Sequence, residues 1–253
     1  PPAVKVAKSS ARARSRSIPE LRFEDQKMTS FAGLAIFQKL FQVLGLLQGL
    51  RGCTSKLDGG STRLYNFGTA VSCLIVHLIL GFRNLRDMDC YRDDPMVLQT
   101  LGLRRLPSVP TLGRMLGEFD DGAVRKLREL SGDLVLSRLR DEAFRRITMD
   151  FDGSVLGTTR RAEGAAVGFN KKKKGARSYY PLFCTVSQSG QVFDYLHRSG
   201  NVHDSNGATD FVARCVPEVR AAIPGAKIEI RMDSAFFSDG MVSCLEGLGV
   251  EYT

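Results

Sequence analysis

The sequence lacks any cluster of cysteine or histidine. Its six cysteines are scattered along 253 residues without a Cys-x-x-Cys pair, and there are only three histidines. This pattern argues against a structural zinc site and against a disulfide scaffold. We expect the thiols to be reduced, as they are in cytoplasmic proteins.

A long apolar segment is missing as well. The longest apolar run, Ala70 to Leu80, is interrupted by Ser72 and His77, whereas a transmembrane helix needs ~20 apolar residues. The basic N-terminal segment has no apolar stretch of the kind that a secretory signal requires. We therefore predict no membrane partner and a location in the cytoplasm.

Negative charge is in short supply. The chain has 36 Lys and Arg residues against 27 Asp and Glu residues, which gives a formal net charge of +9. Such a surplus of positive charge favours an acidic partner, and nucleic acid is the first candidate.

The first part of the chain is predicted to be helical. Residues 1–28 are rich in Ser, Arg and Lys and indicate a flexible basic arm. In residues 29–145 apolar side chains recur at three- and four-residue spacing, which is typical of helices. Ser108 to Phe119 suits a helix-turn-helix, but a bundle that packs on a catalytic core has the same pattern. We expect DNA contact from this region, with helices at residues 31–47, 66–82, 96–101, from 108 or 111 onward, and 124–139.

The period changes near residue 146. Apolar and polar residues now alternate over short stretches, which predicts strands. Residues 146–253 read as three strands, a helix, a strand, a helix and a last strand, which is a mixed α/β fold. The expected strands are 155–159, 178–187, 191–197, 227–232 and 249–253, and the expected helices are 207–222 and 240–248.

Two apolar runs in this part end on an aspartate. Residues 147–152 end at Asp152, and residues 227–233 end at Asp233. If the two strands are neighbours, the carboxylates converge and repel each other unless a cation lies between them, and a divalent metal fits that place. In a basic protein an acidic metal site indicates phosphodiester chemistry on nucleic acid. Each aspartate also has a simpler interpretation, since Asp152-Gly153 is a common hairpin turn and Asp233 suits a helix cap.

The residues around these aspartates form four motif blocks in a fixed order. In their order and spacing they resemble the DDE transposases of bacterial insertion sequences, specifically the group 1 DDE domain. The resemblance is strong after Ile147 and weak before Phe67. The blocks are residues 152–154, 164–171, 198–208 and 231–237.

The resemblance implies a fold and a chemistry. It implies a ribonuclease H-like core, with a five-stranded mixed sheet and helices on its faces, in residues 146–253. Asp152 and Asp233 become the first two catalytic acids and metal ligands, and Asp150 is held in reserve because it shares a strand face with Asp152. The implied cofactor is Mg²⁺ or Mn²⁺, as two ions. The implied function is a transposase that cleaves transposon ends and joins them to target DNA, acting on double-stranded DNA at the nucleoid as a homodimer.

The third acid of the family has no counterpart here. The family's Glu lies on a helix after the fifth strand, and the fifth strand is expected at residues 249–253. Glu246 and Glu251 do not occupy that position, and the chain begins Pro1-Pro2. We therefore expect a C-terminally truncated chain that is inactive alone. A non-catalytic DNA-binding remnant and a hydrolytic nuclease on the same fold stay open as alternatives.

Basic and polar residues near the first aspartate predict DNA contacts. A run of lysines is usually a solvated loop, but cations beside a carboxylate metal site can neutralise DNA phosphates. Tyr179 and Tyr180 point to opposite faces of a strand, so we expect one in the core and the other able to stack on a base. The predicted DNA-binding residues are Arg160, Arg161, Lys171, Lys172, Lys173, Lys174, Arg177, Tyr179, Arg198, Asn201 and Arg231.

Overall fold

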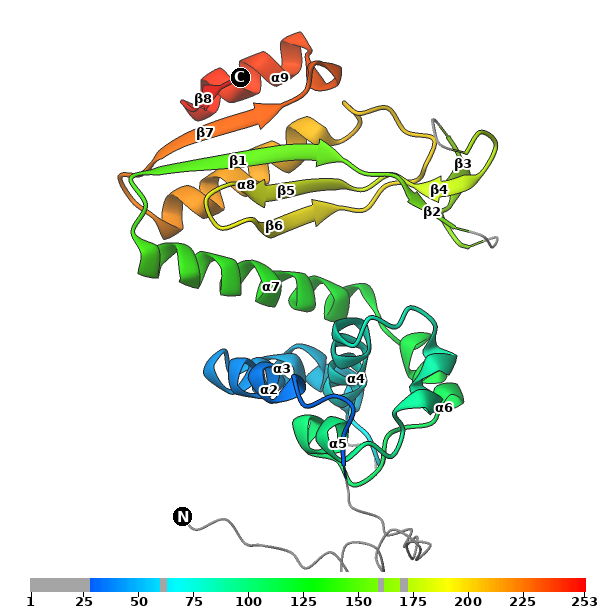
Figure 1. The fold of residues 1–253 in the computed structure, drawn as a ribbon. Coiled ribbons are helices and arrows are strands. Elements are labelled where there is room, and N and C mark those ends of the chain that lie inside the picture. The colour runs from blue at the N-terminus through cyan, green and yellow to red at the C-terminus, as the bar shows by residue number, and fades with distance from the viewer. Residues whose placement is uncertain (1–27, 60–62, 159–161, 169–172) are drawn as a thin grey trace, which may run out of the picture.

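The computed structural model describes residues 28–59, 63–158, 162–168 and 173–253. Its first part is helical, as predicted, and the long helix α7 lies between the other helices and the sheet (Figure 1). None of the described helices combines the length and the apolar character needed to cross a bilayer. The helices are α2 (Leu34–Val43), α3 (Leu46–Asp58), α4 (Phe67–Ile79), the 3₁₀ helix η1 (Leu85–Cys90), α5 (Pro95–Leu101), α6 (Val109–Leu116) and α7 (Asp121–Glu142).

Local signals explain where these helices begin and end. The predicted helix over residues 31–47 is two helices, because Gly45 takes a left-handed conformation (φ 59°) that breaks the first from the second. Asp94 caps α5, with its carboxylate accepting from the amides of Met96 and Val97 and with Pro95 in the first turn. Ser108 caps α6 in the same way.

The helical part has an apolar core of its own. Phe67, Val76, Val97 and Leu112 are among its buried residues, each at most 1% exposed. A second core lies between the sheet and the helices α7, α8 (Ala208–Ala222) and α9 (Asp239–Leu248). The edge-to-face contact of Phe151 and Phe211, with ring centroids 5.6 Å apart, joins the central strand to α8.

A five-stranded mixed sheet carries the second core, in the order β6-β5-β1-β7-β8. Strands β1, β7 and β8 are parallel, whereas β5 and β6 form an antiparallel hairpin whose first strand, β5, pairs antiparallel with β1. The predicted mixed-sheet, ribonuclease H-like fold is thus confirmed. The strands are β1 (Arg146–Gly153), β5 (Leu182–Val186), β6 (Gln191–Leu196), β7 (Lys227–Met232) and β8 (Glu251–Tyr252).

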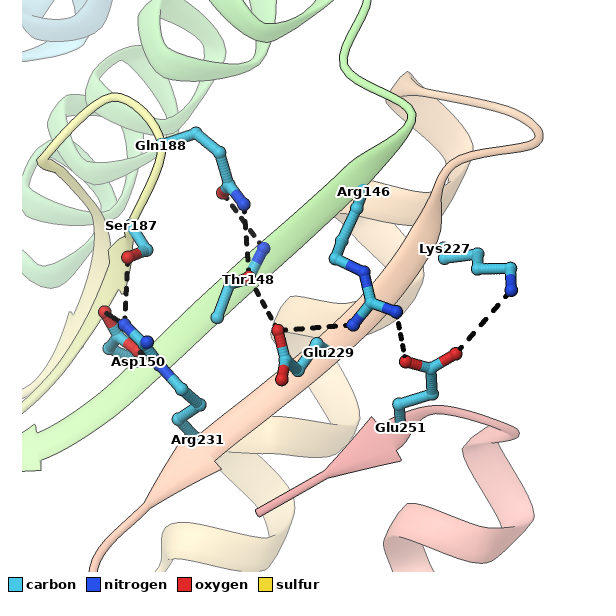
Figure 2. A network of polar contacts seen from close by, with 9 residues as sticks. All are labelled: Arg146, Thr148, Asp150, Ser187, Gln188, Lys227, Glu229, Arg231 and Glu251. Carbon is cyan, nitrogen blue, oxygen red and sulfur yellow. Dashed lines mark hydrogen bonds and ion pairs between the residues drawn. The ribbon is translucent and has the colours of Figure 1, made fainter.

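The two faces of this sheet differ in chemistry. On β1, Ile147, Met149 and Phe151 are at most 2% exposed and face the helices. The alternate residues Thr148, Asp150 and Asp152 therefore lie on the opposite face, which we call the outer face. Polar and charged residues of β1, β7 and β8 gather on the outer face and contact one another (Figure 2).

A small second sheet interrupts the strands predicted after β1. It has the order β2-β4-β3, with β2 (Leu156–Gly157), β3 (Ala166–Val167) and β4 (Arg177–Tyr179). The chain forms it between β1 and β5, and it extends beyond the C-terminal end of β1 (Figure 1). The predicted strand 178–187 is divided into β4 and β5 at Tyr180 and Pro181, since proline has no N–H for a strand ladder.

Candidate metal and DNA site

Asp152 and Asp233 lie at the same end of neighbouring parallel strands. Phe151 of β1 is the direct partner of Met232 of β7, so the next residue on each strand is one of the two aspartates. Because side chains alternate along a strand, the Asp152 carboxylate belongs to the outer face, opposite the core residue Phe151. Both aspartates are exposed. The carboxyl ends of adjacent strands thus bring together two acids that are far apart in the chain.

The contacts of the two carboxylates differ. Asp233 caps the 3₁₀ helix η2 (Ser234–Phe236), and its carboxylate accepts from the amide of Ala235 at 2.7 Å. The cap predicted for Asp233 is therefore confirmed, and Asp233 also lies at the strand end.

The hairpin-turn interpretation of Asp152-Gly153 is wrong, because both residues continue the ladder of β1, opposite Phe183 and Leu182. Among the described residues, none donates a hydrogen bond to the Asp152 carboxylate or pairs with it.

The reserve ligand Asp150 is already occupied. Both of its oxygens accept from the guanidinium of Arg231, at 2.6 and 2.9 Å, and Arg231 also donates to the hydroxyl of Ser187 at 2.9 Å (Figure 2). The hydrogen bond and the charge of Asp150 raise the pKa of Arg231. Bidentate arginine–carboxylate pairs are among the stronger polar contacts in proteins. Asp150 therefore has less capacity for a metal than Asp152. The Arg231 side chain is 49% exposed, and its contact with DNA stays a prediction.

The charged network continues away from the two aspartates. Glu229 accepts from the hydroxyl of Thr148 at 2.8 Å, and Arg146 bridges Glu229 and Glu251 at 3.4 and 2.6 Å (Figure 2). Glu251 is aligned with Glu229 in the sheet, toward the start of β7 and away from Asp233. Glu251 thus pairs with the side chains of Arg146 and Lys227, at the end of the strands opposite to Asp152 and Asp233.

The carboxylates of Asp152 and Asp233 are suitable ligands for a hard divalent cation, but two carboxylates alone do not complete its coordination. Carboxylate oxygens are the ligands that Mg²⁺ and Mn²⁺ prefer, and Mg²⁺ is often held by one or two carboxylates with water. In the part of the chain that the structure describes, no three or more His, Cys, Asp or Glu side chains gather as a metal site. Asp152 and Asp233 can accordingly hold a cation only with further ligands from water, DNA or residues outside that part.

Arg198 is positioned differently from what the sequence suggested. It is only 7% exposed, and its guanidinium donates to the backbone carbonyls of Tyr180, His203, Asp204 and Asn206 at 2.8 to 3.3 Å. A buried guanidinium that donates to four backbone carbonyls has a structural role. Arg198 therefore holds the loop of residues 199–206, and the DNA contact expected of it has no support in the structure.

The two tyrosines also have partners. The hydroxyl of Tyr179 donates to the carbonyl of Glu163 at 2.5 Å, and its ring lies 4.6 Å from the ring of His197. The hydroxyl of Tyr180 donates to the carboxylate of Asp204 at 2.5 Å. The expectation that one of the two tyrosines lies in the core is wrong, because both are only partly buried.

The basic residues near the small sheet are only partly described. Lys173 and Lys174 are exposed, and Arg177 donates to the carbonyl of Ala165 at 2.7 Å. Asn201 is exposed on the loop that Arg198 holds. Arg160, Arg161, Lys171 and Lys172 lie outside the described residues.

Comparisons with known proteins give one family. The model of the family described as transposase DDE domain, group 1, matches residues 12–253. Among curated proteins, none matches the chain.

Several solved transposase structures are similar at low identity. The Mos1 transposase catalytic domain, solved with raltegravir and Mg, is 13% identical over 49% of this chain and 58% of that chain, with a TM-score of 0.30. A piggyBac transposase synaptic complex with hairpin DNA is 14% identical over 87% of this chain and 49% of that chain, with a TM-score of 0.42. The Drosophila P element transposase strand transfer complex is 15% identical over 85% of this chain and 43% of that chain, with a TM-score of 0.39. The chain thus spans less than two thirds of the length of each.

Proposed function

The chain belongs to the group 1 family of transposase DDE domains, and from this premise we propose that it acts in metal-dependent cleavage of transposon ends and in their transfer to target DNA. One observation carries the proposal. Asp152 and Asp233 stand at the ends of adjacent parallel strands, with Phe151 and Met232 as the last paired residues before them. Their exposure leaves them open to a large substrate such as DNA.

In the proposed site Asp152 and Asp233 hold Mg²⁺ or Mn²⁺, as two ions. When bound, divalent ions in such a site help a water or a DNA 3′-hydroxyl to attack a phosphodiester and stabilise the leaving oxygen. The two carboxylates carry the charge that the ions need. Arg231 compensates a third carboxylate on this face, Asp150, so that the negative charge is concentrated on the two strand ends.

We further propose that double-stranded DNA approaches along the small sheet. Lys173 and Lys174 are exposed shortly before β4, and β2 follows soon after the strand that carries Asp152. Phosphate contacts from such residues position a duplex without reading its sequence. In this proposal residues 146–253 form the catalytic unit, the helices of residues 29–145 add DNA contacts, and two copies act together on paired ends.

The test is a nicking and joining assay on DNA that carries the element's own ends. Residues 1–253 and a version that continues past Thr253 are compared in Mg²⁺ and in EDTA. In the longer version we expect Mg²⁺-dependent nicking that Asp152→Asn and Asp233→Asn abolish, because a neutral amide cannot balance the metal charge. Asp121→Asn, an exposed acid in the first turn of α7, is the matched control and keeps the activity. Nicking that both active-site variants retain would refute the proposal.

The same assay separates the alternatives. Because no third acid gathers with these two carboxylates among the described residues, we expect residues 1–253 to nick weakly or not at all. Strong nicking by residues 1–253 would mean that another carboxylate completes the site, with Asp150 and Glu246 the first to test. A protein that binds the ends without cutting them is a DNA-binding remnant, and a cut product that never joins target DNA indicates a hydrolytic nuclease.

A further inference from the structure

The ring of Tyr180 rests directly on Gly153, the residue after Asp152. A Cβ atom built on Gly153 would lie 2.5 Å from both Cζ and Oη of Tyr180 and 3.0 Å from Cε1. Real Cβ contacts are not that short, so any side chain at residue 153 would collide with the ring. The chain therefore comes as close to the aromatic ring as a glycine permits.

This contact explains why a glycine stands in a strand. Gly153 pairs with Leu182 in the ladder of β1, and glycine weakens the interior of a strand because it is flexible and has no side chain to pack. Gly153 is not among the residues with positive φ, so no turn requires it. Glycine in a strand often marks a place where another group comes close, and at Gly153 that group is the ring of Tyr180.

Two side chains, Asp204 and Arg198, hold the Tyr180 ring in place. Its hydroxyl donates to Asp204, and the guanidinium of Arg198 lies over the ring at 5.2 Å from its centroid. Arg198 in turn donates to the carbonyls of Tyr180, His203, Asp204 and Asn206. Burial and the hydrogen bond to Asp204 raise the pKa of Tyr180, and the nearby charge of Asp152 adds to the effect. Tyr180 is thus fixed between the loop of residues 199–206 and the strand end.

We infer that Tyr180, fixed by Asp204 and Arg198, is a positioning residue that sets where the backbone at Asp152-Gly153 lies and therefore where the Asp152 carboxylate meets a metal ion. The inference rests on the proposed function, since it assumes that Asp152 is a ligand. A residue that only orients a metal ligand typically changes metal affinity by about 10-fold to 100-fold when it is altered.

The experiment measures Mn²⁺ binding to residues 1–253 by electron paramagnetic resonance of the free ion, without DNA and without catalysis. Gly153→Ala forces the new methyl group against the ring. We expect about a 10-fold or larger rise in the Mn²⁺ dissociation constant, because the strand end must move. Tyr180→Ala removes the ring, so Gly153→Ala added to Tyr180→Ala is expected to cause little further loss. Such non-additivity identifies a direct contact between the two sites.

Conservative variants test the support of the ring. Tyr180→Phe keeps the ring and loses the bond to Asp204, and Arg198→Lys keeps a charge but cannot bind four carbonyls at once. Both are expected to weaken Mn²⁺ binding less than Gly153→Ala does. Tyr65→Phe is the matched control, since the Tyr65 hydroxyl donates to the carbonyl of Arg105 in the helical part, and it is expected to leave the affinity unchanged.

Loss of stability is separated from loss of position by a further variant. Val219→Ala removes buried side-chain volume in α8, where Val219 is 0% exposed, and should lower the thermal midpoint without changing Mn²⁺ affinity in the folded protein. All affinities are measured well below each variant's midpoint. Wild-type affinity in Gly153→Ala, or equal losses from Gly153→Ala with and without Tyr180, would overturn the inference.

Failure of the proposed function gives a different result. Asp152→Asn should abolish Mn²⁺ binding in the same assay. If Asp152→Asn binds Mn²⁺ as the wild type does, the proposed metal site is refuted and the positioning role falls with it. If Asp152→Asn loses binding while Gly153→Ala keeps it, only the positioning role is refuted.

Discussion

Asp150 and Arg231 are direct partners across the parallel strands β1 and β7, and two hydrogen bonds of 2.6 and 2.9 Å join the carboxylate to the guanidinium. Each lies two residues before an aspartate of the proposed site, Asp150 before Asp152 and Arg231 before Asp233. The outer face thus carries a neutralised pair next to two acids that have no cationic partner among the described residues. This difference in charge balance favours Asp152 and Asp233 as metal ligands over Asp150.

The first prediction concerns these acids. We expect Asp150→Asn to change the Mn²⁺ dissociation constant of residues 1–253 by less than about threefold, because Arg231 already occupies both carboxylate oxygens. Asp233→Asn is expected to abolish binding, since a strand-end carboxylate is removed. Calorimetric titration with Mn²⁺ measures both. Equal losses in the two variants would make Asp150 a ligand.

The second prediction concerns the exposed lysines after β3. Lys173→Ala with Lys174→Ala should weaken binding to duplexes of unrelated sequence to the same extent, because phosphate contacts carry no sequence information. The slope of log affinity against log salt should become shallower by roughly 0.9 for each DNA phosphate that the variant no longer neutralises. Fluorescence anisotropy at several salt concentrations gives both quantities.

A matched control removes two charges elsewhere on the same sheet. Arg145 and Lys227 are exposed at the opposite end of β1 and β7, so Arg145→Ala with Lys227→Ala should leave the salt slope nearly unchanged. If both double variants flatten the slope equally, net charge alone accounts for DNA binding and the lysines have no special place in it.

The third prediction concerns Asp194, which joins β6 to two helices. Its side chain is 11% exposed and accepts from Arg128 of α7, with one hydrogen bond of 2.7 Å, and from Arg214 of α8 at 3.2 Å. Asp194→Asn removes the negative charge from its hydrogen bonds with two guanidinium groups and should lower the free energy of unfolding by roughly 1.5 to 3 kcal/mol. Urea denaturation measures it. For comparison, Glu142→Gln breaks an exposed pair with Arg138 at 4.0 Å and should cost at most about 0.5 kcal/mol; similar losses in both would contradict the prediction.

The fourth prediction is a fall in stability at alkaline pH. Burial raises the pKa of the Cys73 thiol from 9.0 to about 12, so above pH 9 the unfolded chain loses a proton that the folded chain keeps. The free energy of unfolding therefore decreases as pH rises from 9 toward 12, by about 2 kcal/mol at pH 10.5 for this thiol. Cys73→Ala should show a shallower fall in urea midpoint between pH 7.5 and 10.5. Cys90→Ala, at an exposed position, should fall as the wild type does.

Local features of the fold could be predicted from the sequence because they depend on neighbouring residues. The cap of α5 follows from the order Asp94-Pro95, and the bounds of β7 match the alternation from Lys227 to Met232. The single helix predicted over residues 31–47 and the strand predicted over residues 178–187 were too long. Gly45 and Pro181 stop regular structure where the hydrophobic pattern continues.

The alternation of residues in two segments was enough to predict that an aspartate stands at the end of each strand, and the motif blocks identified the family. The contacts around these strand ends depend on how distant segments pack. Asp150 and Arg231 are 81 residues apart, Arg198 is buried by a loop that folds back over it, and Tyr180 touches Gly153 from a distant part of the chain. The periodicity of a single segment reports on its own faces, whereas these contacts depend on strand order and on register across the sheet.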